Sequence, residues 1–427
     1  MERPATIGIL TQLKWLLFRL LELLSELRPG GAGLDAEHAK DAPPLQAGPK
    51  AAPEARPLWV FASTIGELNA IEPFLRCLLA DMAVPPLVLL TDHPHYRDSF
   101  LAKYPGARVY TMDHRSETAA ALAAALPPRL LLLAEIPCLL SDAPCRFPFA
   151  VVYELKRRGI PVCVINGWLY RQAPSCTMDA IEKRLFEREY LRLMDLMTVQ
   201  DEPTRDTLIA QGADPGRVFV TGNVKFDAVS TSNWNPLQAR SRILLESIVA
   251  SSRPTVVAGC VTNLSEQVLA LDAFVAVQQR LPDALLVLAP RHPEVRERME
   301  KLGALLAERK LNYAFKSETG DSPIPRNLNC LILDTMGELK DFYAAGTIAY
   351  VGLNHNVLEP IAFGKPVVVT PGWEPVYPSF PVYQTLLAQG VITQVDDHSH
   401  LGRAWTDLLR DPIAYANKQR EISTLLE

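Results

Sequence analysis

Residues 58–70 read LWVFASTIGELNA, an apolar run that passes directly into a segment with helical spacing. The run at 58–63 has the length and composition of a strand buried on both faces, and a helix is predicted over 67–79. Further apolar runs of the same kind follow, separated by helical stretches, at 86–91, 107–112, 129–135, 160–166, 196–200 and 217–222. This alternation predicts a parallel sheet with helices on both faces.

The rhythm stops at a polar, mostly helical stretch over 226–252 and then begins again. The second set of predicted strands lies at 254–260, 284–290, 311–315, 330–334, 348–352, 366–370 and 391–395. Right-handed βαβ units in each half predict an α/β protein with two Rossmann-like domains, at 58–222 and 253–427, joined by a connection at 223–252. Ligands bind at the carboxyl ends of strands in open α/β sheets, so we expect the site in a cleft between the two domains.

The composition restricts the class of protein. The 427 residues include 43 Lys and Arg against 48 Asp and Glu, a net charge of −5, and 48% are hydrophobic while 21% are charged. A disordered chain would be poorer in apolar residues, and a dedicated nucleic-acid binder would normally show a basic surplus. The seven cysteines include no CxxC pair, which argues against a zinc ribbon and favours a reducing cytosol. No cofactor is predicted.

The N-terminus carries an apolar stretch at 7–28 that is long enough to span a bilayer. Four charged residues interrupt it: Lys14, Arg19, Glu22 and Glu26. They are costly inside a bilayer and fall on one side of a helix, opposite Leu and Ile. The pattern predicts either an amphipathic helix at a membrane surface, with Trp15 and Phe18 near its polar boundary, or a helix packed on the protein's own core. Residues 29–57, rich in Pro, Gly and Ala, read as a linker.

Two acids directly follow strands in the first half. Glu67 would stand in the first turn of a helix beside Ser63, Gly66 and Asn69, and Gly66 permits a tight turn there. The helix dipole favours a carboxylate at this position, and complementing the dipole is an alternative role for Glu67. Asn69 either orients a substrate hydroxyl or faces solvent. Glu135 ends a strand after four leucines and either supports a neighbouring functional group or is an exposed loop acid.

Basic groups and a turn supply a second set of candidates. Asn223 and Lys225 fall at the domain junction, where Lys225 would neutralise an anionic group or form a surface ion pair. Arg291 and His292 follow a strand, and an arginine offers a planar fork for phosphate or carboxylate. The turn at 335–338 would present backbone N–H groups to a phosphate or base edge, or serve as a capping box.

The most specific single motif is NHNVLEPIAFGKPVVV at 354–369. It predicts a helix with Glu359 before Pro360, then a Gly364-Lys365-Pro366 turn into a strand. Glu359 in this position can accept hydrogen bonds from a ribose.

No metal site is predicted. His93, His95 and His114 cluster loosely, but no third ligand has suitable spacing, so we interpret them as loop histidines. No DxD motif occurs, which argues against an enzyme that holds a nucleotide diphosphate through a divalent ion.

Taken together, these segments resemble the 3-deoxy-D-manno-octulosonic acid (Kdo) transferases of lipopolysaccharide synthesis. The resemblance runs in order from about Leu58 to about Val395. Its strongest pieces are STIGELNA (63–70), RRGIPVCVINGWL (157–169), TGNVKFD (221–227), APRHPE (289–294), DTMGEL (334–339) and HNVLEPIAFGKPV (355–367). It implies a GT-B fold, two Rossmann-like domains facing across a cleft. It also favours attachment of residues 7–28 to the cytoplasmic face of the bacterial inner membrane, as a peripheral or monotopic protein.

The resemblance further implies a metal-independent reaction and a role for each candidate. Glu67 would be the base that deprotonates a sugar hydroxyl of a lipid A precursor (lipid IVA), with Glu135 supporting it. That hydroxyl would attack the anomeric carbon of CMP-Kdo, with inversion and loss of CMP. Ser63, Gly66 and Asn69 would line the acceptor side. The donor side would comprise Lys225, Arg291, His292, Met336, Gly337, Glu338, Asn356 and Glu359. The implied partners are the donor, the lipid acceptor and a membrane surface, with no nucleic acid.

The chain departs from the family pattern at three places. Residues 260–264 replace a Thr-His-Glu-Gly-Glu-like segment, Trp168 follows Asn166-Gly167 where the family usually has Arg, and the Gly-rich loop before His355 is shortened. These changes touch donor contacts. Two alternatives therefore stay open: a related GT-B transferase with another donor or acceptor, and a non-catalytic paralogue that binds nucleotide or lipid.

Overall fold

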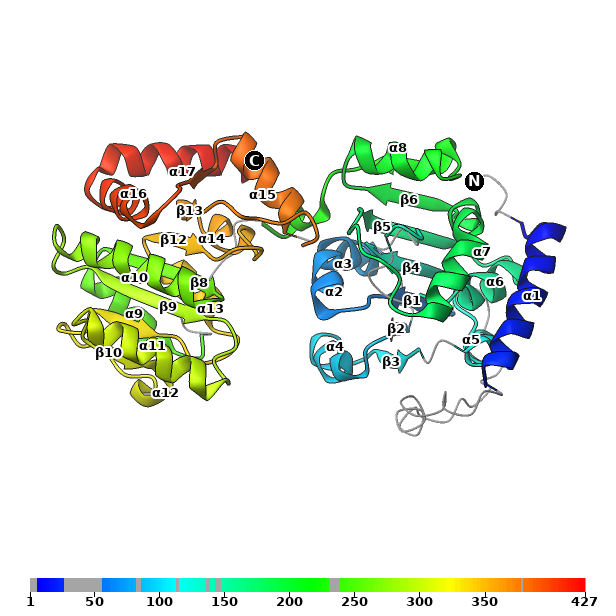
Figure 1. Ribbon diagram of the computed structural model, residues 1–427, viewed down its shortest axis with the longest axis horizontal. Helices are drawn as coiled ribbons and strands as arrows, with labels where there is room; N and C mark the ends of the chain where they lie inside the picture. The colour runs from blue at the N-terminus through cyan, green and yellow to red at the C-terminus, as the bar shows by residue number, and fades with distance from the viewer. Residues whose placement is uncertain are drawn as a thin grey trace. The chain divides into compact units, whose positions relative to one another are not determined.

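The computed structural model describes residues 6–26, 56–81, 86–112, 115–135, 139–142, 147–229, 239–377 and 379–426. The chain divides into two compact units, Met1–Ala228 and Val229–Glu427. Each unit is built on one seven-stranded sheet in which the paired strands are parallel (Figure 1). Most of the predicted linker at 29–57, and His114, lie outside the described residues.

The N-terminal sheet has the strand order β3-β2-β1-β4-β5-β6-β7. Its strands are β1 (Leu58–Phe61), β2 (Leu87–Thr91), β3 (Arg108–Thr111), β4 (Leu130–Ala134), β5 (Val162–Gly167), β6 (Leu196–Val199) and β7 (Val218–Val220). The connecting helices are α2 (Ile65–Ala70), α3 (Glu72–Asp81), α4 (Arg97–Lys103), α5 (Ser116–Ala125), α6 (Phe149–Arg157), α7 (Thr177–Leu193) and α8 (Glu202–Ala210). Short 3₁₀ turns occupy η3 (Pro94–Tyr96), η4 (Pro215–Arg217) and η5 (Val224–Val229).

The C-terminal sheet repeats this plan in the order β10-β11-β9-β8-β12-β13-β14. Its strands are β8 (Thr255–Val261), β9 (Leu285–Pro290), β10 (Tyr313–Phe315), β11 (Cys330–Ile332), β12 (Ile348–Val351), β13 (Val367–Val369) and β14 (Ile392–Gln394). Its helices are α9 (Arg242–Ser251), α10 (Leu264–Gln278), α11 (Arg296–Glu308), α12 (Lys316–Thr319), α13 (Leu339–Ala345), α14 (Leu358–Ala362), α15 (Phe380–Ala388), α16 (His398–Arg410) and α17 (Pro412–Leu426).

The strands are apolar on both faces because each sheet face carries its own core. In β1, Trp59 and Phe61 point into one buried cluster, and Leu58 and Val60 point into another. This follows from the alternation of side chains along a strand. All four residues are buried, which is the burial expected of a parallel sheet covered by helices on both sides. The α/β class and the Rossmann-like halves predicted from the sequence are confirmed.

The single helix predicted over 67–79 is two helices. α2 ends at Ala70 and α3 begins at Glu72, with Ile71 between them in a non-helical conformation. Pro73 explains the break, because proline has no N–H to donate into a preceding turn and its ring obstructs that turn. It is tolerated in the first turn of α3 for the same reason.

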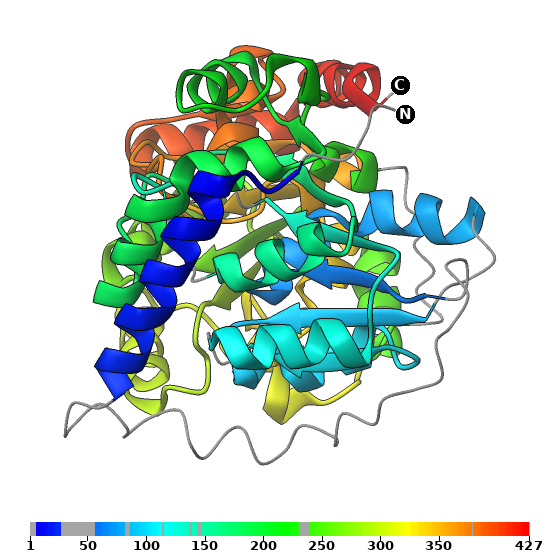
Figure 2. The same cartoon turned by 90° about the vertical axis from the view of Figure 1, so that its right-hand side faces the viewer.

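Helix α1 (Ile9–Glu26) packs along α7 on the outside of the N-terminal unit (Figure 2). Trp15 and Phe18 are buried, with the Trp15 ring 4.7 Å from the ring of Tyr153 and the Phe18 ring 5.7 Å from that of Phe186. Trp15 and Phe18, predicted near the polar boundary of a membrane-surface helix, are instead buried against the body, as the alternative of a packed helix requires. They lie against the body because the large aromatic rings fill the space between α1, α6 and α7.

The polar side of α1 also faces the protein. Lys14 forms a salt bridge with Glu189 at 2.7 Å, Arg192 donates to the Thr11 hydroxyl at 3.1 Å, and the Ser116 N–H donates to Glu22 at 3.1 Å. The apolar side is exposed, with large aliphatic side chains between 46% and 78% accessible at Ile9, Leu10, Leu13, Leu16, Leu17, Leu20, Leu23 and Leu24. Within the part of the chain that the structure describes, no helix combines the length and apolar character needed to cross a bilayer.

Candidate active site

The two predicted acids lie on either side of the point, between β1 and β4, where the strand order of the N-terminal sheet reverses. Strand order runs outward from β1 to β3 on one side and from β4 to β7 on the other. Glu67 follows β1 and Glu135 follows β4, so both stand at the carboxyl ends of the two strands that flank the reversal. This position is where open α/β sheets bind ligands, because the loops separate there.

Glu67 is a buried carboxyl group in the first turn of α2, with its side chain folded back onto the loop before the helix. The backbone N–H of Ser63 donates to Glu67 Oε2 at 2.6 Å, and the hydroxyl of Thr64 caps the Glu67 N–H at 3.3 Å. Burial raises the pKa of Glu67 to about 8, and the charges of Glu135 and Asp92 add to this. Glu67 can thus exchange a proton near neutral pH, as a general base must.

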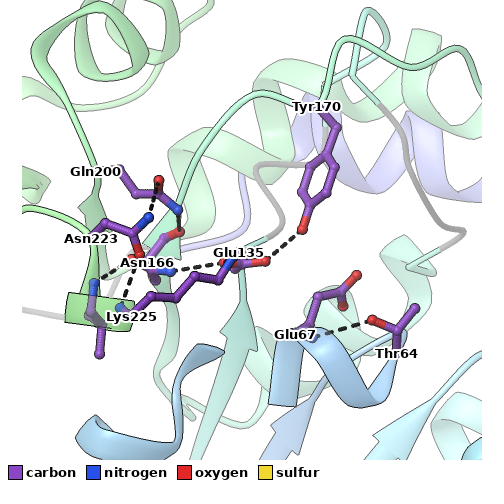
Figure 3. A network of polar contacts seen from close by, with 9 residues as sticks. Thr64, Glu67, Glu135, Asn166, Tyr170, Gln200, Asn223 and Lys225 are labelled. Atoms are coloured by element: carbon purple, nitrogen blue, oxygen red, sulfur yellow. Dashed lines mark hydrogen bonds and ion pairs between the residues drawn. The ribbon is translucent and has the colours of Figure 1, made fainter. Parts of the chain in front are cut away.

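Glu135 is buried at 1% exposure and is surrounded by donors (Figure 3). Its carboxylate accepts from the Tyr170 hydroxyl at 2.6 Å and from the Asn166 side-chain amide at 2.9 Å, and it pairs with Lys225 at 2.9 Å. Its backbone has a φ of 62°, a conformation that non-glycine residues adopt at a cost. The predicted alternative of an exposed loop acid is wrong, because these three donors compensate the buried charge.

The network continues across the neighbouring strand ends. Asn166 Oδ1 accepts from the Val224 N–H at 2.9 Å, and Gln200 donates to the Asn166 carbonyl at 3.2 Å. Asn223 in turn donates to Gln200 Oε1 at 3.0 Å (Figure 3). The loops that follow β4, β5, β6 and β7 are thereby held together, and Lys225 contacts Glu135 within the N-terminal unit.

The three residues predicted around Glu67 differ in their surroundings. Ser63 donates its hydroxyl to Asp92 at 2.6 Å, in addition to its backbone bond to Glu67. Asn69 is exposed and accepts from Lys103 at 2.6 Å. Gly66 does not provide the tight turn predicted for it, because it lies inside α2 and a Cβ there would make only an ordinary contact with Thr64 at 3.5 Å.

A second group of polar side chains stands at the reversal point of the C-terminal sheet, between β8 and β12. His355 Nε2 lies 3.0 Å from the hydroxyl of Thr262 and 3.3 Å from a guanidinium nitrogen of Arg291. Because a guanidinium only donates, Nε2 accepts and the ring proton resides on Nδ1. Burial and the nearby Arg291 and His292 lower the pKa of His355 to about 4, so the ring is neutral near pH 7.

The neutral ring of His355 thereby positions the Arg291 side chain but leaves its positive charge uncompensated. No carboxylate forms a salt bridge with it among the residues that the structure describes, and its side chain reaches the protein surface. An oriented guanidinium with spare N–H groups is suited to bind a phosphate or carboxylate. Its predicted neighbour His292 has a φ of 58° and lies 3.0 Å from Glu294.

The remaining donor-side candidates fall into two segments. Glu359 lies at the start of α14, where burial raises its pKa and the side chains of Lys340 and Asn356 oppose that effect. Glu338 is buried at the start of α13 and accepts from the hydroxyls of Ser241 and Thr335, so its carboxylate already has partners. Met336 is 73% exposed and Gly337 has a φ of 86°, as a turn before a helix requires.

Several residues of both groups were not identified from the sequence. Four of these residues follow strands: Tyr170, Gln200, Thr262 and His355. Their position shortly after an apolar run is the one sequence feature from which they could have been predicted. The sequence predicts no metal site at His93 and His95, because no third ligand has suitable spacing. Among the described ranges, no group of three or more His, Cys, Asp or Glu side chains is placed to hold a metal ion.

The fold defines the class of protein first. Two Rossmann-like units on parallel seven-stranded sheets are the two halves of a GT-B protein. A solved UDP-GlcNAc 2-epimerase from Neisseria meningitidis, bound to UDP-GlcNAc, has this fold. It matches 85% of this chain and 94% of its own with a TM-score of 0.57 and 16% sequence identity.

Sequence similarity relates the chain to one group of transferases. Residues 39–228 match the family model of 3-deoxy-D-manno-octulosonic-acid transferase (kdotransferase). The 3-deoxy-D-manno-octulosonic acid transferase of Bordetella pertussis is 29% identical over 340 residues, covering 75% of this chain and 72% of that protein. The one from Chlamydophila psittaci is 27% identical over 325 residues, covering 73% and 69%. The resemblance to the Kdo transferases predicted from the sequence is thus confirmed.

Proposed function

We propose that this protein transfers Kdo from CMP-Kdo to a hydroxyl of a lipid A precursor, lipid IVA, with inversion at the anomeric carbon. In this reaction the acceptor oxygen forms a bond to the anomeric carbon while the bond from that carbon to the CMP phosphate oxygen breaks. The acceptor proton moves to Glu67, and CMP leaves with the bonding electron pair. A single displacement of this kind needs one base on the acceptor side and positive charge on the donor side.

The observation that carries the proposal is the environment of Glu67. A carboxyl group with a pKa of about 8, fixed by the Ser63 N–H at the reversal point of the sheet, has the basicity that removing a hydroxyl proton demands. Glu135 supports it as a neighbouring carboxylate that helps to raise the pKa of Glu67. Its own carboxylate is held by Lys225, Asn166 and Tyr170.

On the donor side, Arg291 is the group proposed to meet the CMP phosphate. His355 and Thr262 orient its guanidinium, and Glu359 and Asn356 lie close together at the start of α14. The turn at Met336 and Gly337 offers backbone groups to the nucleotide. Lys225, which the sequence favoured for this side, pairs with Glu135 and is assigned here to the acceptor half.

The exposed side of α1 supports binding to the cytoplasmic face of the inner membrane. A lipid acceptor must be met at a bilayer surface, and eight neighbouring aliphatic side chains of α1 are open to solvent. Aliphatic surface of this extent is unfavourable in water and favourable at the boundary between headgroups and acyl chains. The salt bridge of Lys14 and the burial of Trp15 and Phe18 would hold the acceptor domain at a fixed height on that surface.

The reaction is tested by measuring CMP release from CMP-Kdo with purified protein, with and without tetraacylated lipid A precursor. The wild type is expected to release CMP only with the acceptor, and Glu67→Gln to lose about 10²–10⁴-fold in rate, the usual contribution of a general base. Glu72→Gln is a matched control, because Glu72 lies on the neighbouring helix and pairs with Lys103 rather than with the Glu67 network. Equal rates in Glu67→Gln and the wild type would refute the assignment of the base.

A related donor is the second candidate, favoured by one observation. Thr262, within the segment that departs from the family pattern, contacts His355 where the donor phosphate is proposed to lie. If CMP binds but CMP-Kdo is not consumed, the same assay is repeated with other CMP-activated acidic sugars. Consumption of one of these with lipid acceptor would replace Kdo as the donor.

A further inference from the structure

Three aromatic side chains gather on the loop that follows β2, beside the proposed base. The imidazole rings of His93 and His95 stack with centroids 5.4 Å apart and an angle of 18° between their planes. The ring of Tyr96 lies 4.1 Å from that of His95 and 6.1 Å from that of His93. Tyr96 also packs against the buried core on that side of the sheet, so the group of rings has a rigid base.

This aromatic loop, residues 92–96, is hydrogen-bonded directly to the loop that carries Glu67. Thr91 donates its hydroxyl to the Ser63 carbonyl at 2.8 Å and accepts from the His93 N–H at 3.1 Å. Asp92 accepts from the Ser63 hydroxyl at 2.6 Å, and the Ser63 N–H binds Glu67 at 2.6 Å. Ser63 and Thr91 therefore connect the loop that carries the rings to the loop that carries the carboxylate.

The polar atoms of the three rings lack protein partners among the residues that the structure describes. Within the described ranges, no hydrogen bond or salt bridge involves a ring nitrogen of His93 or His95 or the hydroxyl of Tyr96. His95 is exposed, and His93 and Tyr96 are half-buried. Arg97 follows directly and is also without a salt bridge among those residues. The loop thus presents ring faces, N–H donors and a guanidinium to solvent.

We infer that residues 92–96 form a subsite for the sugar headgroup of the acceptor. The inference deepens the proposed function and rests on it, because it names the part of the site that holds the acceptor. A sugar ring has an apolar C–H face that packs on an aromatic ring, and its hydroxyl and phosphate oxygens accept from N–H and O–H donors. The stacked rings offer both features at the edge where the base stands.

A metal site does not explain the same residues. No cluster of three possible ligands includes His93 or His95 in the part of the chain described, and the nearest carboxylate, Asp92, is engaged with Ser63. A flat ligand surface fits this arrangement better than an ion.

The kinetic test compares His95→Ala with His95→Phe in the CMP-release assay, at saturating donor and varied lipid acceptor. His95→Ala is expected to raise the acceptor KM about threefold to tenfold, and His95→Phe to recover part of that loss because it keeps the ring face. The KM for CMP-Kdo should stay within about twofold of the wild type in both. His400→Ala is the control, since His400 lies on α16 of the other unit. An unchanged acceptor KM in His95→Ala overturns the subsite.

A binding measurement keeps this inference separate from the proposed reaction. Imidazole NMR signals of the full-length protein are followed while the water-soluble, deacylated glucosamine disaccharide bisphosphate is added. The signals of His93 and His95 are expected to shift and those of His398 and His400 to stay. Shifts without any turnover would uphold the subsite and refute the proposed reaction. Turnover without shifts of His93 and His95 would refute the subsite and uphold the proposed reaction.

Discussion

The ammonium group of Lys225 lies 2.9 Å from Oε1 of Glu135, and only 1% of the Glu135 side chain is exposed. The two residues belong to different segments, since Glu135 ends β4 and Lys225 follows β7. The pair therefore joins the loop at the end of the N-terminal sheet to the acid beside the proposed base. It also compensates a negative charge that would otherwise be buried alone.

Removing the ammonium should cost stability because it leaves that charge without its cation. We expect Lys225→Met to lower the free energy of unfolding by about 3–5 kcal/mol, the usual cost of breaking a buried pair by one partner. Urea unfolding followed by circular dichroism measures it. In the double variant with Glu135→Gln, much of this loss should be recovered, because the buried charge is gone, the amide oxygen can accept from Asn166, and the amide NH2 can donate to the Tyr170 hydroxyl. Additive losses in the double variant would show that the pair is not coupled.

The pH dependence of the rate should report the pKa of Glu67. Because a base must be ionised, kcat/KM should rise with pH through the region near 8. The charge of Glu135 contributes to raising that pKa, so Glu135→Gln should move the rising limb toward lower pH. Asp92→Asn should move it in the same direction by less, and Glu72→Gln should leave it in place. A limb that stays fixed in Glu135→Gln would exclude the electrostatic role given to Glu135.

The fold was predictable from the sequence because each strand is a continuous apolar run. A run such as CLILD at 330–334 can only be buried on both faces, and the observed strand β11 falls inside it. Boundaries were less predictable, since the last residues of a run depend on whether the neighbouring strand offers a ladder partner. The run 217–222 forms strand only at Val218–Val220, where β6 pairs with it.

The site was predictable only in part, for a physical reason. Glu135 was identified because it comes immediately after a buried strand, and Glu67 because it opens the helix that follows one; both features are visible in the local sequence. Their partners were not, because contact between Glu135 and Tyr170 depends on β4 lying beside β5, and strand order is not written in the local sequence. The same holds for Thr262 and His355, which meet because β8 and β12 are neighbours.

The exposed side of α1 should decide membrane binding. Replacing Leu13, Leu16, Leu20 and Leu24 with Gln should lower partitioning onto anionic phospholipid vesicles by at least roughly 100-fold, since each buried leucine contributes about 1.5–3 kcal/mol. Vesicle co-sedimentation measures it. Stability should change little, because these side chains are exposed in the protein itself.

Phe18→Ala provides the contrast on the opposite side of α1. It should cost about 3–5 kcal/mol of stability, because Phe18 is fully buried against Phe186. Undiminished sedimentation of the four-leucine variant would refute the proposed membrane contact. A dimer of the wild type that this variant abolishes would instead identify the leucine face as a protein interface.

Glu67→Gln should gain stability relative to the wild type as the pH rises, although it loses activity. The pKa of Glu67 lies at about 8 in the folded protein against an ordinary 4.5, so the folded state binds more protons between these values. Wild-type stability therefore falls as pH rises through this range, whereas a glutamine has no proton to lose. The melting temperature of the variant should exceed that of the wild type by several degrees at pH 8.5 and by less at pH 5.5. A constant difference would show that Glu67 does not titrate there.

Arg291 should control donor binding through the shape of its side chain as well as its charge. Arg291→Ala should raise the KM for CMP-Kdo about tenfold to 100-fold, since a hydrogen bond to a charged group contributes about 1.5–3 kcal/mol. Arg291→Lys should recover only part of this loss, because an ammonium lacks the planar fork that His355 orients. His355→Ala and Thr262→Val should give smaller increases, because both act on the donor through Arg291. Steady-state CMP release at saturating acceptor measures all four variants. Full recovery in Arg291→Lys would mean that a positive charge at this position is sufficient to bind the donor phosphate. The contact with His355 would then have no role in positioning the guanidinium.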